Sequence, residues 1–217
     1  MPSLIEAWEQ LDSPWQTAFD LAWEGFWAGS PPIGAVVTDP DGHVVSSGRS
    51  RQFEVAAPSG QLAGTNLAHA EINALVQLAR GDYSGHVLFT TLEPCLLCTS
   101  AITHSHVGTV RYAAADPLWT GIRRLPELNP HVKRRWPAWV GPMDTPLALL
   151  SNALVVIWHL EHRPGHALVD AHAGDGSAIL EVARAISPLM HDLKGSRLAG
   201  AVRTLSKHIT HSANSQR

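Results

Sequence analysis

The segment TNLAHAEINALVQLARG, residues 65–81, places a histidine and a glutamate two positions apart where an apolar helix begins. On a regular helix, side chains two positions apart diverge by about 200°. His69 and Glu71 can therefore serve one site only if His69 lies just before the helix, where the backbone need not be helical. The pattern predicts a helix from about Ala68 to Arg80, ended by Gly81, with both polar residues at its N-terminal mouth.

A second segment, TTLEPCLLCTSAI at residues 90–102, contains the only two cysteines of the chain. Cys95 and Cys98 follow Pro94 at the start of a predicted helix and share one helix face. Free backbone N–H groups and the helix dipole favour thiolates there, and thiolates bind zinc. His69 would complete three ligands, which is the number typical of a catalytic zinc site. Glu71 then remains free to carry protons.

The rest of the chain predicts a layered α/β fold with a helical C-terminal part. A helix from about Ser13, a hairpin around Asp39–Gly42 and two short apolar strands, HVLFTT and GTVRYAAA, alternate with the two helices above. Residues 120–146 are rich in proline and predict irregular chain or a linker. Thr145-Pro146 opens a further apolar helix that ends at Pro164-Gly165, and helical patterning continues to about Ile209 with breaks at Pro188 and Gly195.

Composition excludes several classes of protein. The chain has 217 residues, of which 45% are hydrophobic, so a packed core is expected. There is no long uncharged apolar run for a membrane span and no basic, apolar secretory signal. With only two cysteines a disulfide framework is not expected, and a cytoplasmic location is the default expectation.

The net charge of −3 is unevenly distributed along the chain. Residues 1–120 carry 4 Lys and Arg against 12 Asp and Glu, whereas residues 121–217 carry 12 against 7. Binding to a polyanion needs several cationic contacts, so the acidic first part disfavours a nucleic-acid partner. The basic run Lys133–Arg135 predicts a solvated surface first, with phosphate or RNA contact as the alternative.

The two motifs together resemble those of a known family. His-Ala-Glu followed by Pro-Cys-x-x-Cys resembles the zinc-dependent cytidine deaminase-like superfamily. PPIGAVV, AHAEINAL and TLEPCLLCTSAI resemble its branch of guanine deaminases and tRNA adenosine deaminases, over roughly residues 14–121. The resemblance implies a three-layer α/β fold with a central mixed sheet between helices. It also implies one Zn²⁺ per chain, with His69, Cys95 and Cys98 as ligands and Glu71 as the proton shuttle.

The resemblance also implies where the substrate is held. Asp116 follows a strand at a place where members of this branch carry an acidic residue near the substrate. Ser50 stands where many members have asparagine in Gly-x-Asn-Arg, and a hydroxyl replaces an amide's donor and acceptor poorly. Trp119 is expected as a wall of the pocket, with plain core packing as its alternative. Glu93 is expected to be a structural carboxylate, with a second catalytic acid as the alternative.

These expectations combine into one functional hypothesis. Residues 1–121 form the catalytic domain, residues 122–146 a Pro/Trp-rich connection, and residues 147–217 a helical extension packed on the core. The favoured reaction is hydrolytic deamination of a free nucleobase or nucleoside, with a guanine-type purine preferred, and the resemblance allows a homodimer. The alternatives are a tRNA adenosine deaminase, a pyrimidine deaminase and a non-catalytic binding module. A redox Cys-x-x-C motif, a structural zinc site and a second metal cluster at His159, His162 and His166 are weaker alternatives.

Overall fold

The computed structural model describes residues 2–173 and 178–212. Outside this described part lie residue 1 and two segments of the expected extension, residues 174–177 and 213–217. The helices and strands are α1 (Leu4–Glu9), α2 (Ser13–Trp27), β1 (Gly34–Thr38), β2 (Val44–Arg49), α3 (Ala70–Leu75), β3 (Val87–Leu92), α4 (Leu96–Ser105), β4 (Thr109–Ala114), η1 (Pro117–Trp119), η2 (Ile122–Arg124), α5 (Leu125–Leu128), α6 (Pro130–Arg135), β5 (Ala138–Val140), α7 (Pro146–His162), α8 (Ala167–Ala173), α9 (Ala178–Leu193) and α10 (Leu198–Ser212).

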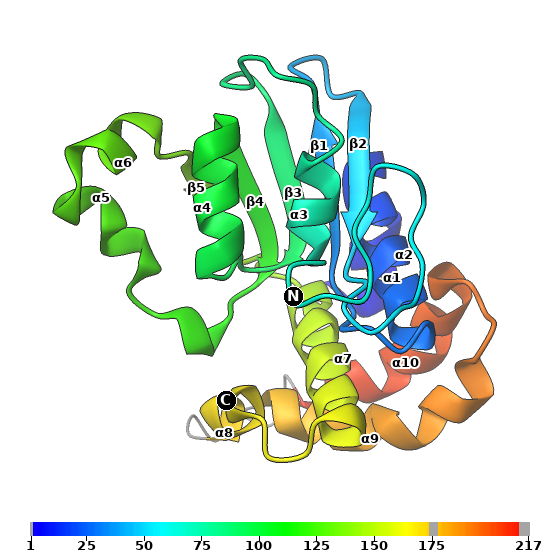
Figure 1. Ribbon diagram of the computed structural model, residues 1–217. Coiled ribbons are helices and arrows are strands. Elements are labelled where there is room, and N and C mark those ends of the chain that lie inside the picture. Colours follow the sequence, from blue (N-terminus) through cyan, green and yellow to red (C-terminus); the bar gives the residue numbers. More distant parts are fainter. Residues whose placement is uncertain (1, 174–177, 213–217) are drawn as a thin grey trace.

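The five strands form one mixed sheet in the order β2-β1-β3-β4-β5 (Figure 1). β1 pairs antiparallel with both β2 and β3, whereas β3, β4 and β5 run parallel. Strand alternation directs neighbouring side chains to opposite faces. Val36 and Phe89 belong to the core beneath α2 and α7, while Val37 and Leu88 belong to the core beneath α3 and α4. The expected mixed sheet with helices on both faces is thus confirmed.

Three local predictions differ from the structure. The expected irregular linker instead forms the short helices η2, α5 and α6, and its residues Ala138–Val140 form β5, which extends the sheet beside β4. α3 ends at Leu75 rather than near Arg80, and the Asn73 carbonyl accepts a hydrogen bond from the side chain of Gln77. Pro188 lies inside α9 and does not divide it. A short strand at the edge of a sheet leaves little pattern in the sequence. The same holds for a side-chain hydrogen bond that takes the place of a backbone hydrogen bond of the helix.

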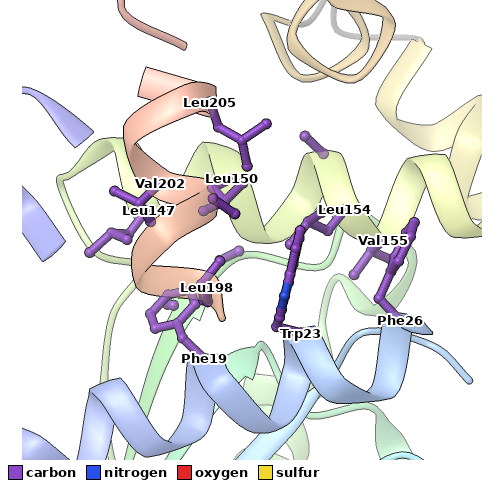
Figure 2. Close-up of a cluster of buried hydrophobic side chains, with 14 of the residues drawn as sticks. Phe19, Trp23, Phe26, Leu147, Leu150, Leu154, Val155, Leu198, Val202 and Leu205 are labelled. Atoms are coloured by element: carbon purple, nitrogen blue, oxygen red, sulfur yellow. The ribbon is translucent and has the colours of Figure 1, made fainter. Parts of the chain in front are cut away.

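The C-terminal helices share the core of the α/β layers. α7, α9 and α10 gather at one end of the sheet, where Figure 2 shows side chains of α7 and α10 interleaved with Phe19, Trp23 and Phe26 of α2. The Trp23 indole also donates a hydrogen bond of 2.8 Å to the Ser196 carbonyl. In the described part of the chain, no helix combines the length and the hydropathy needed to cross a bilayer.

Leu150→Ala tests whether this shared core holds the two parts together. Leu150 on α7 is 0% exposed, and its truncation leaves a cavity, so we expect the free energy of unfolding to fall by about 2–5 kcal/mol. Leu160→Ala on the same helix is the matched control, because Leu160 is 49% exposed and should cost well under half as much. Denaturant unfolding measures both variants, and equal costs would show that α7 is not part of the common core.

Candidate active site

The site lies where two parallel strands end side by side. β3 ends at Leu92 and leads through Glu93 to α4, while β4 ends at Ala114 just before Asp116. Because parallel strands present their carboxyl ends at one edge of a sheet, Glu93 and Asp116 emerge together. The backbone N–H of Asp116 donates to Glu93 Oε2 at 3.3 Å, which ties the two loops to each other.

The N-termini of α3 and α4 point to the same place. His69 is the N-cap of α3 with extended dihedral angles, φ −75° and ψ 157°, and Glu71 occupies the first turn. The prediction that His69 precedes the helix is therefore confirmed. Cys95 is likewise the N-cap of α4, which puts Cys98 in its first turn. A Cβ at Gly48 would lie 2.6 Å from the backbone of α3, so a glycine in β2 is needed for this helix to pack so closely.

Three donor atoms of these helix starts converge. Nδ1 of His69 lies 3.6 Å from Sγ of Cys95 and 3.5 Å from Sγ of Cys98, and the two sulfurs are 3.6 Å apart. A tetrahedral zinc ion with ordinary bond lengths requires about 3.8 Å between two sulfurs and about 3.5 Å between sulfur and nitrogen. The donor set and its spacing therefore fit a zinc ion with one position left for water or substrate.

The surroundings of His69 suit this role of Nδ1. A histidine that binds through Nδ1 carries its proton on Nε2 and donates it outward. The Asn66 carbonyl accepts a hydrogen bond from the ring, and the side-chain amide of Gln52 lies 3.2 Å from Nε2. The Asn66 carbonyl is the acceptor that orients the ring toward the sulfurs, because the Gln52 atom near Nε2 is an amide nitrogen and is itself a donor.

The two thiols differ in their electrostatics. A hydrogen bond from Cys98, together with His69, lowers the pKa of Cys95 to about 4. Burial raises the pKa of Cys98 well above its usual value, and the neighbouring Cys95 and Glu71 add to the effect. A second thiolate beside the first is stable only with a cation between them, which is what a bound zinc ion provides.

Glu71 lies beside the donor set and is almost completely buried, with 3% exposure. Its Oε1 accepts a hydrogen bond of 3.1 Å from the Thr90 hydroxyl, and its Oε2 lies 3.3 Å from Sγ of Cys98. Burial raises the pKa of this carboxyl. A carboxylate with a raised pKa, held next to a metal position, has the properties of a group that takes up and returns a proton.

Residues 9–114 match the family model of the cytidine and deoxycytidylate deaminase zinc-binding region. This region is a zinc-binding cytidine deaminase-like domain. The matched residues end at the last residue of β4, so the loop with Asp116 and all of the C-terminal helices lie outside the family match.

Known proteins are similar to this deaminase domain over different lengths. The riboflavin biosynthesis protein RibD of Mycobacterium tuberculosis is 38% identical over 93 residues, which are 40% of this chain and 24% of that protein. The tRNA-specific adenosine deaminase of Aquifex aeolicus is 29% identical over 147 residues, 63% of this chain and 89% of that protein. A solved guanine deaminase of Nitrosomonas europaea superposes with a TM-score of 0.51 at 20% identity, covering 74% of this chain and 94% of that one, and shows the fold alone. The chain thus spans about a quarter of the length of RibD.

A cavity of about 240 Å³ opens above the donor set of the deaminase domain. Asp116 and Trp119 line it, with Asp116 buried and Trp119 39% exposed on η1. Ser50 does not line it, because its side chain is buried and its hydroxyl faces Gln52. Gln52 lines the cavity instead, two positions further along the loop, and the motif spacing gave no signal for it.

Asp116 is held through one carboxylate oxygen, and its other oxygen has no hydrogen-bond partner among the residues that the structure describes. Its Oδ1 accepts a hydrogen bond of 2.9 Å from the Leu118 N–H and caps η1. Burial raises the pKa of Asp116 to about 6, so this carboxyl is still mainly ionised at neutral pH. Glu93 also lines the cavity, but its Oε1 pairs with Arg123 at 2.9 Å and its Oε2 accepts from the Asp116 N–H. These contacts favour a structural role for Glu93.

The outer wall of the cavity comes from the C-terminal extension. α7, the connection after it and α8 contribute a set of side chains that sequence reasoning did not connect with the site, namely Val155, Trp158, His159, Arg163, His166 and Leu168. His159, His162 and His166 were visible in the sequence, yet they do not form a metal-binding group among the described residues. Only tertiary packing places α7 over a site built from residues 52–119.

Proposed function

We propose that the chain catalyses the zinc-dependent hydrolytic deamination of an amino-substituted nucleobase ring in a small molecule. The observation that carries this proposal is the buried Glu71 carboxylate beside the His69, Cys95 and Cys98 donors on the floor of a cavity. A zinc ion held by these three side chains supplies Lewis acidity, which makes water nucleophilic near neutral pH. Redox chemistry and a purely structural zinc site leave Glu71 unexplained.

The residues of the chain account for the proton movements. Glu71 accepts the proton that the attacking water loses and delivers it to the ring nitrogen, after which it assists the departure of ammonia. The carbon exchanges its amino group for oxygen, so water and substrate give the oxo ring and ammonia. Free backbone N–H groups in the first turn of α4, next to Cys95, are placed to stabilise negative charge on the ring carbon's new oxygen.

A guanine-type purine is the ring that we propose first. The free oxygen of Asp116 is an acceptor, and a guanine-type ring offers N–H donors to it. Trp119 gives an apolar surface against which a planar ring can stack. A pyrimidine ring with similar donors is the alternative within small molecules.

Ammonia release from a substrate panel tests the proposal. The zinc-loaded protein should release ammonia from at least one member of a panel of guanine, adenine and cytosine compounds supplied as bases, nucleosides and 5′-monophosphates. The reaction should stop on zinc removal and return on zinc addition. Zinc-loaded protein that is inactive on the entire panel and on RNA would support a non-catalytic binding module.

Deamination of tRNA adenosine is the second candidate. It is favoured by the similarity to the tRNA-specific adenosine deaminase of Aquifex aeolicus and by the exposed cations of α6, Lys133 and Arg134. A tRNA substrate requires several phosphate contacts, so its affinity should fall by orders of magnitude between about 50 and 200 mM salt. A small molecule should show at most a modest change. Inosine formation in tRNA with a steep salt dependence would replace the first proposal.

Asp116→Asn tests the contact with the ring. Asparagine can still cap η1, but it can present a donor where the substrate needs an acceptor, so we expect about 2–4 kcal/mol less transition-state stabilisation. Steady-state kcat/KM on the best panel substrate measures this loss. Asp144→Asn, which makes the same chemical change at an exposed position, should leave kcat/KM unchanged. Equal kcat/KM values for the two variants would place Asp116 outside the substrate contacts.

A further inference from the structure

Basic side chains gather on the outer wall of the cavity, opposite its acidic floor. Within residues 159–166, at the end of α7 and in the segment that follows it, the chain carries His159, His162, Arg163 and His166. His159, Arg163 and His166 line the same cavity as the zinc donors. The rings of His159 and His166 are in contact, with centroids 4.3 Å apart.

Among the described residues, no carboxylate forms a salt bridge with this group. Within residues 2–173 and 178–212, Arg163 makes no ion pair and no side-chain hydrogen bond. Burial first, with the nearby His166 and Arg163 contributing, lowers the pKa of His159 to about 4, so this ring is neutral at neutral pH. Burial and Arg163 likewise lower the pKa of His166. The cation of this wall is therefore Arg163, and an unpaired guanidinium at a cavity mouth is stabilised when an anion binds beside it.

The hydrogen-bonding state of the two rings leaves a donor available. The Leu168 N–H donates to Nδ1 of His166 at 3.3 Å, so the proton of the neutral ring lies on Nε2. Nδ1 of His159 instead donates to the Val155 carbonyl at 2.8 Å. His166 Nε2 and the Arg163 guanidinium are therefore hydrogen-bond donors on this wall.

Trp158 lies behind this wall. The residue is 0% exposed, so its indole contributes packing to the cavity rather than a donor. The wall thus offers donors from two side chains, the guanidinium of Arg163 and the imidazole N–H of His166.

We propose that Arg163, with His166, forms a subsite for a phosphate group carried by the substrate. A phosphate has three terminal acceptor oxygens and is bound well by a guanidinium, which matches the donors of this wall. The inference rests on the proposed function, because it places the amino-bearing ring at Glu71 and the phosphate at the mouth. The substrate class is then an aminated heterocycle linked to a sugar phosphate rather than a free base.

Binding of ribose 5-phosphate tests the subsite without any catalytic step. Calorimetric titration of the zinc-loaded protein should show binding of ribose 5-phosphate and none of ribose at the same concentrations. Arg163→Gln should weaken this binding by about 10- to 100-fold, and Arg163→Lys by less, because lysine keeps the charge but loses the fork of donors. Arg184→Gln, at an exposed position of α9 outside the cavity, is the matched control and should bind as the wild type does.

Two results would overturn the subsite. One is equal binding of ribose 5-phosphate by wild type and Arg163→Gln, and the other is no binding beyond that of ribose. In the substrate panel, the 5′-monophosphate of the active ring should exceed the nucleoside in kcat/KM, and Arg163→Gln should remove this advantage. A protein that binds ribose 5-phosphate through Arg163 but deaminates nothing would refute the proposed function while retaining the subsite.

Discussion

Glu71→Gln is expected to lower kcat by about 10² or more while the protein keeps its zinc and its fold. Glutamine has the size of glutamate and can still accept the hydrogen bond from the Thr90 hydroxyl, so the local packing remains. It cannot take up or return a proton near neutral pH. The measurements are steady-state turnover on the active panel substrate and zinc content by elemental analysis of the same sample.

A second glutamate of the cavity provides the comparison for Glu71→Gln. Glu93→Gln makes the same chemical change, but Glu93 is engaged by Arg123 and by the backbone of Asp116. We expect it to lose clearly less activity than Glu71→Gln. Loss of zinc in Glu71→Gln would instead identify Glu71 as a metal ligand, and unchanged turnover would exclude it as the proton carrier.

Cys98→Ala should remove the zinc ion and much of the stability of the site. Cys98 is completely buried at the first turn of α4, and its loss leaves two donors that cannot hold the ion firmly. We expect zinc affinity to fall by more than about 10²-fold, which exceeds the effect of losing a group that only orients a ligand. Zinc content should drop from about one per chain to near zero, and the melting temperature should approach that of chelator-treated wild type.

The control for Cys98→Ala lies on the same helix. Ser100→Ala changes an exposed hydroxyl of α4 and should leave both zinc content and melting temperature unchanged. Full zinc retention in Cys98→Ala would exclude Cys98 from the ligand set. Two firmly held zinc ions in the wild type would contradict the single site.

The resemblance to the zinc-dependent deaminases implied the deaminase-like fold, whereas the motifs at residues 69–71 and 95–98 themselves predicted the zinc-binding chemistry. The reason is local: a helix N-cap fixes where His69 and Cys95 begin their helices, and i, i+3 spacing brings Cys98 to the same face. Such constraints act within a few residues and can therefore be read along the chain. The alternation of apolar segments similarly predicted the α/β layers and α7.

Tertiary structure alone decided how the cavity is closed and which side chains line its outer wall. Arg163 and Trp158 are more than forty residues from Asp116 in sequence, and they reach the cavity only because α7 packs against the sheet and α2 (Figure 2). Gln52 lines the cavity, whereas Ser50 is buried with its hydroxyl facing Gln52. These positions follow from packing between distant segments, which leaves no periodic pattern in the sequence. The sequence by itself therefore determined the chemistry of the floor, whereas the packing of the extension decided the charge at the mouth.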